Sequence, residues 1–95
     1  MSAYAVFTRE RTLNASELQL YAEKVASTFA GHPYKTLAAY GRFEDLEGPP
    51  TEGTVIIEFP SMEAARAWYD SPAYREVREH RLEGAVYRAV LVEGV

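Results

Sequence analysis

Aromatic, hydroxyl-bearing and cationic side chains gather in the stretch EFPSMEAARAWYDSPAYREVREHR, which runs from Glu58 to Arg81. Trp68, Tyr69 and Tyr74 flank its Asp-Ser-Pro interruption. Aromatic rings whose polar ends need partners can line a pocket that has an apolar wall and a few hydrogen-bonding points. The same rings can equally be core contacts of a small protein. The core is the favoured interpretation for Trp68, and both interpretations stay open for the two tyrosines.

The cationic residues of this stretch lie near its end, and they are Arg75, Arg78, His80 and Arg81. Cations at a helix C-terminus complement the helix dipole, so a solvated helix end is the favoured interpretation of the group. Arg81 is the exception, because helical spacing places it on one face with Tyr74 and Val77. A guanidinium partly buried there needs a carboxylate, from the protein or from a ligand. The candidate ligand-binding residues are therefore Tyr69, Tyr74, His80 and Arg81.

Other chemistry finds little support in the residue types. The chain has no cysteine, so disulfides, thiolate nucleophiles and cysteine-ligated metals are excluded. Its two histidines, His32 and His80, are far apart in the sequence, and we expect no tightly bound metal and no cofactor. Haem would need an axial ligand, which only these two histidines could readily supply. No phosphate-cradling glycine loop, HExxH motif or Ser-His-Asp order is present.

Length and charge place these residues in one globular domain, residues 1–95. The chain has 95 residues, of which 47% are hydrophobic, and a net charge of −4. A nucleic-acid partner is not expected, because it would call for a basic excess on one face. The N-terminus lacks the pattern of a signal peptide, and no apolar run reaches the ~18 residues of a membrane span. We therefore expect a cytoplasmic protein that has no membrane partner.

The elements that must position the candidate site are predicted from local patterns. Apolar runs and alternation predict four strands, at residues 3–8, 34–41, 54–59 and 85–92. A helix is expected from Ala15 to Ala30, because Asn14 suits its N-cap and Gly31 its left-handed C-terminal position.

A second helical region is expected to be broken. Ser61 can cap a segment over Met62–Tyr69. Pro72 would strain an unbroken helix by about 3 kcal/mol, whereas Ser71 can act as a new N-cap with Pro72 as the first helical residue. A second segment is therefore expected over Pro72–Arg81.

The predicted order is β-α-β-β-α-β. This order is that of an α+β, ferredoxin-like fold, in which two helices cover one face of a four-stranded antiparallel sheet. The strands are apolar on both faces, as with Tyr4 and Val6 against Ala5 and Phe7. A second sheet is the natural cover for the face without helices, so a homodimer is expected. A monomer with mixed faces is the alternative.

The segment Glu58–Gly94 resembles the DUF1330 family of the dimeric α/β-barrel superfamily. The shared pattern comprises Phe59-Pro60-Ser61, Ala64-Ala65, Trp68-Tyr69, Ser71, Tyr74, Arg81 and a closing strand that ends near Glu93-Gly94. The resemblance implies a ferredoxin-like protomer whose sheet packs against that of a second copy. It implies no particular chemistry, because the activity of the family is not established.

Two functional hypotheses follow. The first is a binding module, or an enzyme that needs no cofactor, which holds a small acidic or polar metabolite between the helices and the sheet. Tyr69, Tyr74 and Arg81 would be its polar contacts. Superfamily analogy supports a monooxygenase- or isomerase-like activity, although the sequence leaves open whether the protein is an enzyme. The second hypothesis is a non-enzymatic structural or interaction dimer.

Overall fold

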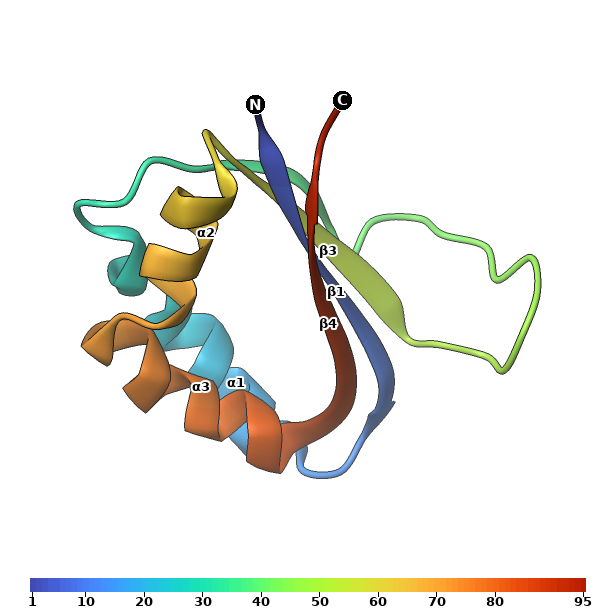
Figure 1. Ribbon diagram of the computed structural model, residues 1–95. Coiled ribbons are helices and arrows are strands. Elements are labelled where there is room, and N and C mark those ends of the chain that lie inside the picture. The colour runs from blue at the N-terminus through green and yellow to red at the C-terminus, as the bar shows by residue number, and fades with distance from the viewer.

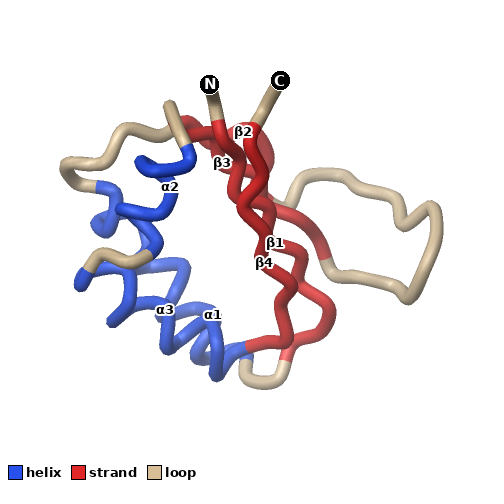
Figure 2. Tube along the Cα trace, viewed as in Figure 1, coloured by secondary structure: helices blue, strands red, loops and turns tan.

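The computed structural model describes residues 1–95 and contains a four-stranded sheet with helices on one face (Figure 1). The elements in chain order are β1 (Ala3–Thr12), α1 (Ala15–Lys24), the 3-10 helix η1 (Val25–Phe29), β2 (Lys35–Ala39), β3 (Gly53–Phe59), α2 (Met62–Tyr69), α3 (Pro72–Gly84) and β4 (Ala85–Glu93). The strand order is β2-β3-β1-β4, and each neighbouring pair is antiparallel. The predicted α+β, ferredoxin-like topology is confirmed. Figure 2 shows the helices on one side of the strands, and the connection between β2 and β3 projecting from the other side.

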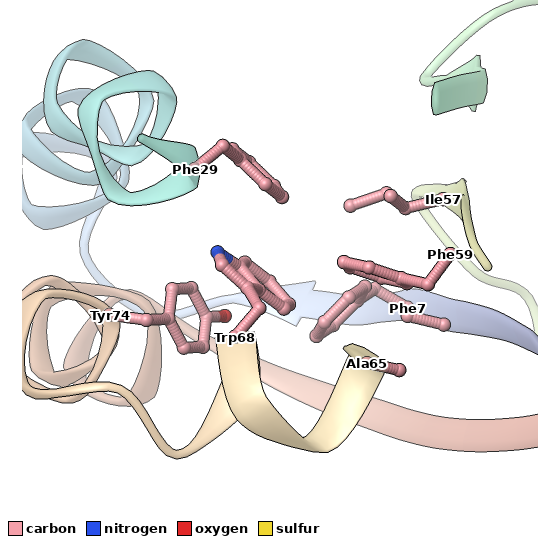
Figure 3. Close-up of a cluster of buried hydrophobic side chains, with 8 residues drawn as sticks. Phe7, Phe29, Ile57, Phe59, Ala65, Trp68 and Tyr74 are labelled. Atoms are coloured by element: carbon pink, nitrogen blue, oxygen red, sulfur yellow. The ribbon is translucent and has the colours of Figure 1, made fainter. Parts of the chain in front are cut away.

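The core lies between the sheet and the helices, with Trp68 at its centre (Figure 3). The indole is inaccessible to solvent and stacks on Phe29 at 4.7 Å between ring centroids. Its Nε1 donates to Thr28 Oγ1 at 3.0 Å, which satisfies the one polar group of the ring. Ala5 and Phe7 of β1 point into the same cluster, as strand alternation requires. The core interpretation of Trp68 is confirmed.

The predicted break in the second helical region is also confirmed. The Ser71 side chain accepts a hydrogen bond from the Tyr74 backbone N–H at 3.2 Å, and Pro72 occupies the first turn of α3. Ser71 Oγ also donates to the Trp68 carbonyl at 2.8 Å. This one hydroxyl therefore joins the end of α2 to the start of α3.

The first helical region differs from the single helix predicted over Ala15–Ala30. The α-helix ends at Lys24, and a 3-10 helix continues to Phe29. In this turn Ser27 and Thr28 bond back to the carbonyls of Lys24 and Val25. Hydroxyl side chains compete with helical hydrogen bonds in this way, and the tighter turn places Thr28 and Phe29 together against the core tryptophan.

Several strand and helix limits also differ from those predicted. β2 is shorter than residues 34–41, since Tyr40 adopts a positive φ of 56° that ends the strand. β1 extends past the predicted end at residue 8, and α3 extends three residues past Arg81. The extension of α3 matters for the site, because it places Arg81 inside the helix rather than at its last residue.

Candidate functional site

A cavity of about 400 Å³ lies between α1 and the helix-covered face of the sheet. α1 packs on α3 and has no fully buried residue. Leu18 and Ala22 of α1 and Val25 of η1 line the cavity. The other residues that line it are Phe7, Arg9, Tyr21, Thr36, Ala39, Tyr40, Val55, Arg81 and Tyr87. The volume is within the range of pockets that bind small molecules.

Arg81 is the buried charge of this cavity. Only 3% of its surface is exposed. Its Nε donates to the Tyr74 hydroxyl at 3.3 Å, and its guanidinium lies 5.2 Å from the ring centroid of Phe7 and 5.0 Å from that of Tyr87. Carboxylates form ion pairs with Arg9, Arg66 and Arg88, and Glu17 contacts the His80 ring, so no carboxylate neutralises Arg81.

Two tyrosines link Arg81 to α1. The Tyr74 side chain is fully buried, and its hydroxyl lies 2.9 Å from that of Tyr21, which lines the cavity. Burial raises the pKa of both hydroxyls, so both keep their protons near neutral pH. Burial by itself lowers the pKa of Arg81, but the neighbouring tyrosines outweigh it, and this pKa lies above its ordinary value. The group therefore combines a permanent cation with neutral hydroxyls.

A second pair of tyrosines spans the sheet at the side of the cavity. The hydroxyls of Tyr40, which follows β2, and Tyr87, in β4, are hydrogen-bonded to each other. The Arg9 guanidinium lies 4.7 Å from the Tyr40 ring centroid, and Arg9 also pairs with Glu52 at 3.0 Å. Burial raises the pKa of Tyr40 as well.

The Tyr40 ring depends on a glycine. A Cβ built on Gly53, which has a φ of +135°, would lie 2.7 Å from the Tyr40 ring. Glycine is thus required there both by the backbone conformation and by the ring above it. The Tyr40 side chain is contacted at the side of the cavity by the Arg9 guanidinium and by the Tyr87 hydroxyl.

The structure brings together two of the four candidate residues. Tyr74 and Arg81 are hydrogen-bonded, whereas Tyr69 contacts the ring of Tyr74 and lines a separate hollow of about 290 Å³ beside β4. His80 Nδ1 lies 2.5 Å from Glu17 Oε2 and so ties α3 to α1 outside the cavity. Tyr69 and His80 therefore do not line the cavity that contains Arg81.

Five polar residues of the cavity were not among the candidates: Arg9, Tyr21, Thr36, Tyr40 and Tyr87. The sequence could have predicted that Tyr21 faces the sheet, because it lies three positions after Leu18 and therefore on the apolar side of α1. The position of Tyr87 could also have been predicted, since alternation in β4 places it on the same face as Leu91. No sequence pattern could have predicted the position of Tyr40, because it depends on a backbone turn and on the absence of a side chain at Gly53.

No three histidine, aspartate or glutamate side chains lie close enough together to hold a metal ion. None of the helices has the length and apolar character needed to cross a bilayer.

The fold and the cavity define a ferredoxin-like α+β protein that has a ligand-sized space between its first helix and its sheet. The profile of the family described as a domain of unknown function, DUF1330, matches residues 2–95. The chain belongs to this family, as the resemblance of its C-terminal segment predicted. No curated protein matches the sequence.

Several solved structures share the fold. The RPA0582 protein of unknown function from Rhodopseudomonas palustris is 22% identical with a TM-score of 0.74, over 99% of this chain and 82% of its own. A dimeric ferredoxin-like protein of unknown function from Jannaschia sp. CCS1 is 11% identical with a TM-score of 0.75, over 99% of this chain and 100% of its own. SnoaB, a cofactor-independent oxygenase from Streptomyces nogalater, is 11% identical with a TM-score of 0.58, over 99% and 92%. These likenesses concern the fold.

Proposed function

We propose that this protein binds a small acidic or polar metabolite in the cavity between α1 and the sheet, with Arg81 supplying the charge that holds it. The observation that carries the proposal is the burial of Arg81 without a carboxylate partner. An unpaired buried ion costs several kcal/mol in lost solvation. A bound anion would compensate this cost and would also fill the apolar space beside α1.

The enzymatic form of this proposal is a cofactor-independent reaction that passes through an enolate or another oxyanion. Hydrogen-bond donors and a cation fixed in a cavity of low polarity stabilise negative charge that develops on oxygen. Arg81 and the protonated tyrosines are groups of this kind. The shared fold of SnoaB, a cofactor-independent oxygenase, supports such a reaction by analogy.

The test is native mass spectrometry of the protein purified from the cells that produce it. Wild-type protein is expected to retain a small anionic molecule, and Arg81→Ala is expected to lose it while the melting temperature changes little. Arg75→Ala is the charge-matched control, because Arg75 lies exposed on the same helix. An Arg81→Ala variant that melts far lower yet retains the ligand would show that Arg81 is a structural residue.

Two further variants address the remaining candidate residues. Tyr69→Phe and His80→Gln should both retain the molecule, because neither side chain lines the cavity. Loss of the molecule from either variant would extend the binding site beyond the cavity, to the end of α2 for Tyr69 or to the side of α3 that carries His80.

We also propose a homodimer that forms through the sheet face without helices. Val6 of β1 lies opposite Ile56 of β3 and Val90 of β4, and the three form an apolar row across this face. Val90 is 49% exposed, whereas a valine of the core is buried. This row is also the observation that favours the alternative function, a non-enzymatic interaction dimer.

The connection between β2 and β3 supports the same assembly. It projects from the side of the sheet on which a second copy would lie (Figure 1). Its Phe43 and Leu46 are exposed, Leu46 to 86%. A partner on the outer face would lie beside this segment and could cover both side chains.

A further inference from the structure

The hydrogen-bond requirements of Tyr74 determine where the proton of Tyr21 points. The Tyr74 hydroxyl is buried, accepts a hydrogen bond from Arg81 Nε at 3.3 Å and has one other partner, the Tyr21 hydroxyl at 2.9 Å. A buried hydroxyl hydrogen needs an acceptor, and Tyr21 is the one within reach. Tyr74 therefore donates to Tyr21. The hydrogen of Tyr21 is left without a protein acceptor, on a side chain that lines the cavity.

The charge of the cavity limits what can bind there. Arg9, the second arginine of the lining, is paired with Glu52 at 3.0 Å. One positive charge, that of Arg81, remains without an acidic partner. The surrounding wall is largely apolar and includes Phe7, Leu18 and Val55. A single negative charge on an apolar body matches this arrangement, and a second negative charge would be buried without a partner.

Resting on the function proposed above, we propose that the ligand is a monoanion with an apolar body, and that its charged oxygen is bound jointly by the Arg81 guanidinium and the Tyr21 hydroxyl. Carboxylates and enolates share this chemistry. Tyr74 is a positioning residue: it touches both groups but not the ligand. Tyr74 accepts a hydrogen bond from a cation and donates one to Tyr21. This series of hydrogen bonds polarises the Tyr21 hydroxyl and strengthens it as a donor.

The experiment is a calorimetric titration with benzoate, a planar monoanion, and with its neutral analogue benzamide. Wild-type protein should bind benzoate and should bind benzamide at least tenfold more weakly. Tyr21→Phe removes only the hydroxyl and should weaken benzoate binding about tenfold or more, as expected for a hydrogen bond to a charged group. Tyr34→Phe is the matched control and should bind like the wild type, because Tyr34 lies outside the cavity.

A second readout separates a contact from a merely structural effect. The protein is labelled with ¹³C at the tyrosine Cζ and studied by NMR, and the Tyr21 signal is assigned as the one that is absent from the spectrum of Tyr21→Phe. In the wild type this signal should shift when benzoate is added. The readout does not depend on the stability of the Tyr21→Phe variant. Arg81→Ala should remove benzoate binding altogether.

The outcomes distinguish this inference from the proposal on which it rests. If Arg81→Ala loses benzoate while Tyr21→Phe binds it as tightly as the wild type and the Tyr21 signal stays still, the role of Tyr21 is overturned and the anion site stands. If benzoate binds no more tightly than benzamide, or equally well to Arg81→Ala, the anion site itself is overturned.

Discussion

At the scale of single residues, the cavity is defined by groups that change protonation only at the alkaline end of the pH range. Arg81 stays charged, and burial raises the pKa of Tyr21, Tyr40 and Tyr74. Tyrosines that are difficult to ionise remain hydrogen-bond donors. They also make the stability of the protein sensitive to high pH.

We predict that the free energy of unfolding decreases as the pH rises above about 10, the ordinary pKa of tyrosine. The pKa values of Tyr21 and Tyr74 are higher in the folded state, so the unfolded chain loses these protons first. Their contribution to stability is fully present below that pH and is lost above it. Urea unfolding at several pH values should show a steeper decline for the wild type than for Tyr74→Phe. The exposed-ring variant Tyr34→Phe should decline like the wild type, and parallel curves for the wild type and Tyr74→Phe would contradict the prediction.

At the scale of elements, the cavity depends on how α1 rests on the end of α3. The Gly84 carbonyl accepts hydrogen bonds from the backbone N–H groups of Leu13 and Asn14, at 2.8 and 2.9 Å. A Cβ built on Gly84 would lie 2.7 Å from the Leu18 side chain and 3.1 Å from the Leu18 backbone nitrogen. The absence of a side chain at Gly84 therefore lets α1 approach α3 and places Leu18 at the wall of the cavity.

Gly84→Ala is predicted to lower the free energy of unfolding by about 1–3 kcal/mol, because the backbone of α1 must move to admit the methyl group. Guanidinium-induced unfolding followed by tryptophan fluorescence measures this change through Trp68. The matched control is Gly41→Ala, since a Cβ at Gly41 meets open space and its φ is not positive. Equal stability of the two variants would show that the α1–α3 contact tolerates a side chain at this point.

At the scale of the whole molecule, the sheet has one face packed by helices and one face that carries an apolar row. Apolar strand residues facing water are a cost that a second copy can remove. The row formed by Val6, Ile56 and Val90 crosses β1, β3 and β4, and a partner on this face would bury it. The projecting segment between β2 and β3 would then lie at the rim of the interface.

Sedimentation velocity at micromolar concentration is predicted to give about twice the 10.7 kDa mass of the chain. Val90→Lys should shift the protein toward the monomer, because a lysine there would place a charge in the apolar interface. The monomer should remain folded, since Val90 is about half exposed within one chain. Ala67→Lys, on the exposed side of α2, should leave the mass unchanged. A wild-type protein that sediments as a monomer throughout would rule out the dimer.

The elements of this protein are determined largely by local sequence. Asn14, Ser61 and Ser71 cap helices as their residue types predict, because capping depends on groups only two or three residues away. Alternation in β1 likewise predicts which side chains enter the core. Tyr74 and Arg81 share a helical face seven positions apart, so their contact could also be predicted.

Tertiary structure decided what surrounds those elements. The 3-10 turn that follows α1 brings Thr28 and Phe29 against Trp68, a residue far away in the chain. The hydrogen bond between Tyr40 and Tyr87 joins the residue that follows β2 to a residue of β4. Whether Arg81 meets a carboxylate depends on every element packed around it. The absence of a carboxylate partner therefore could not be predicted from local sequence. The sequence thus determined the elements, whose causes lie within a few residues, while the cavity and its unpaired charge arise from contacts between distant segments.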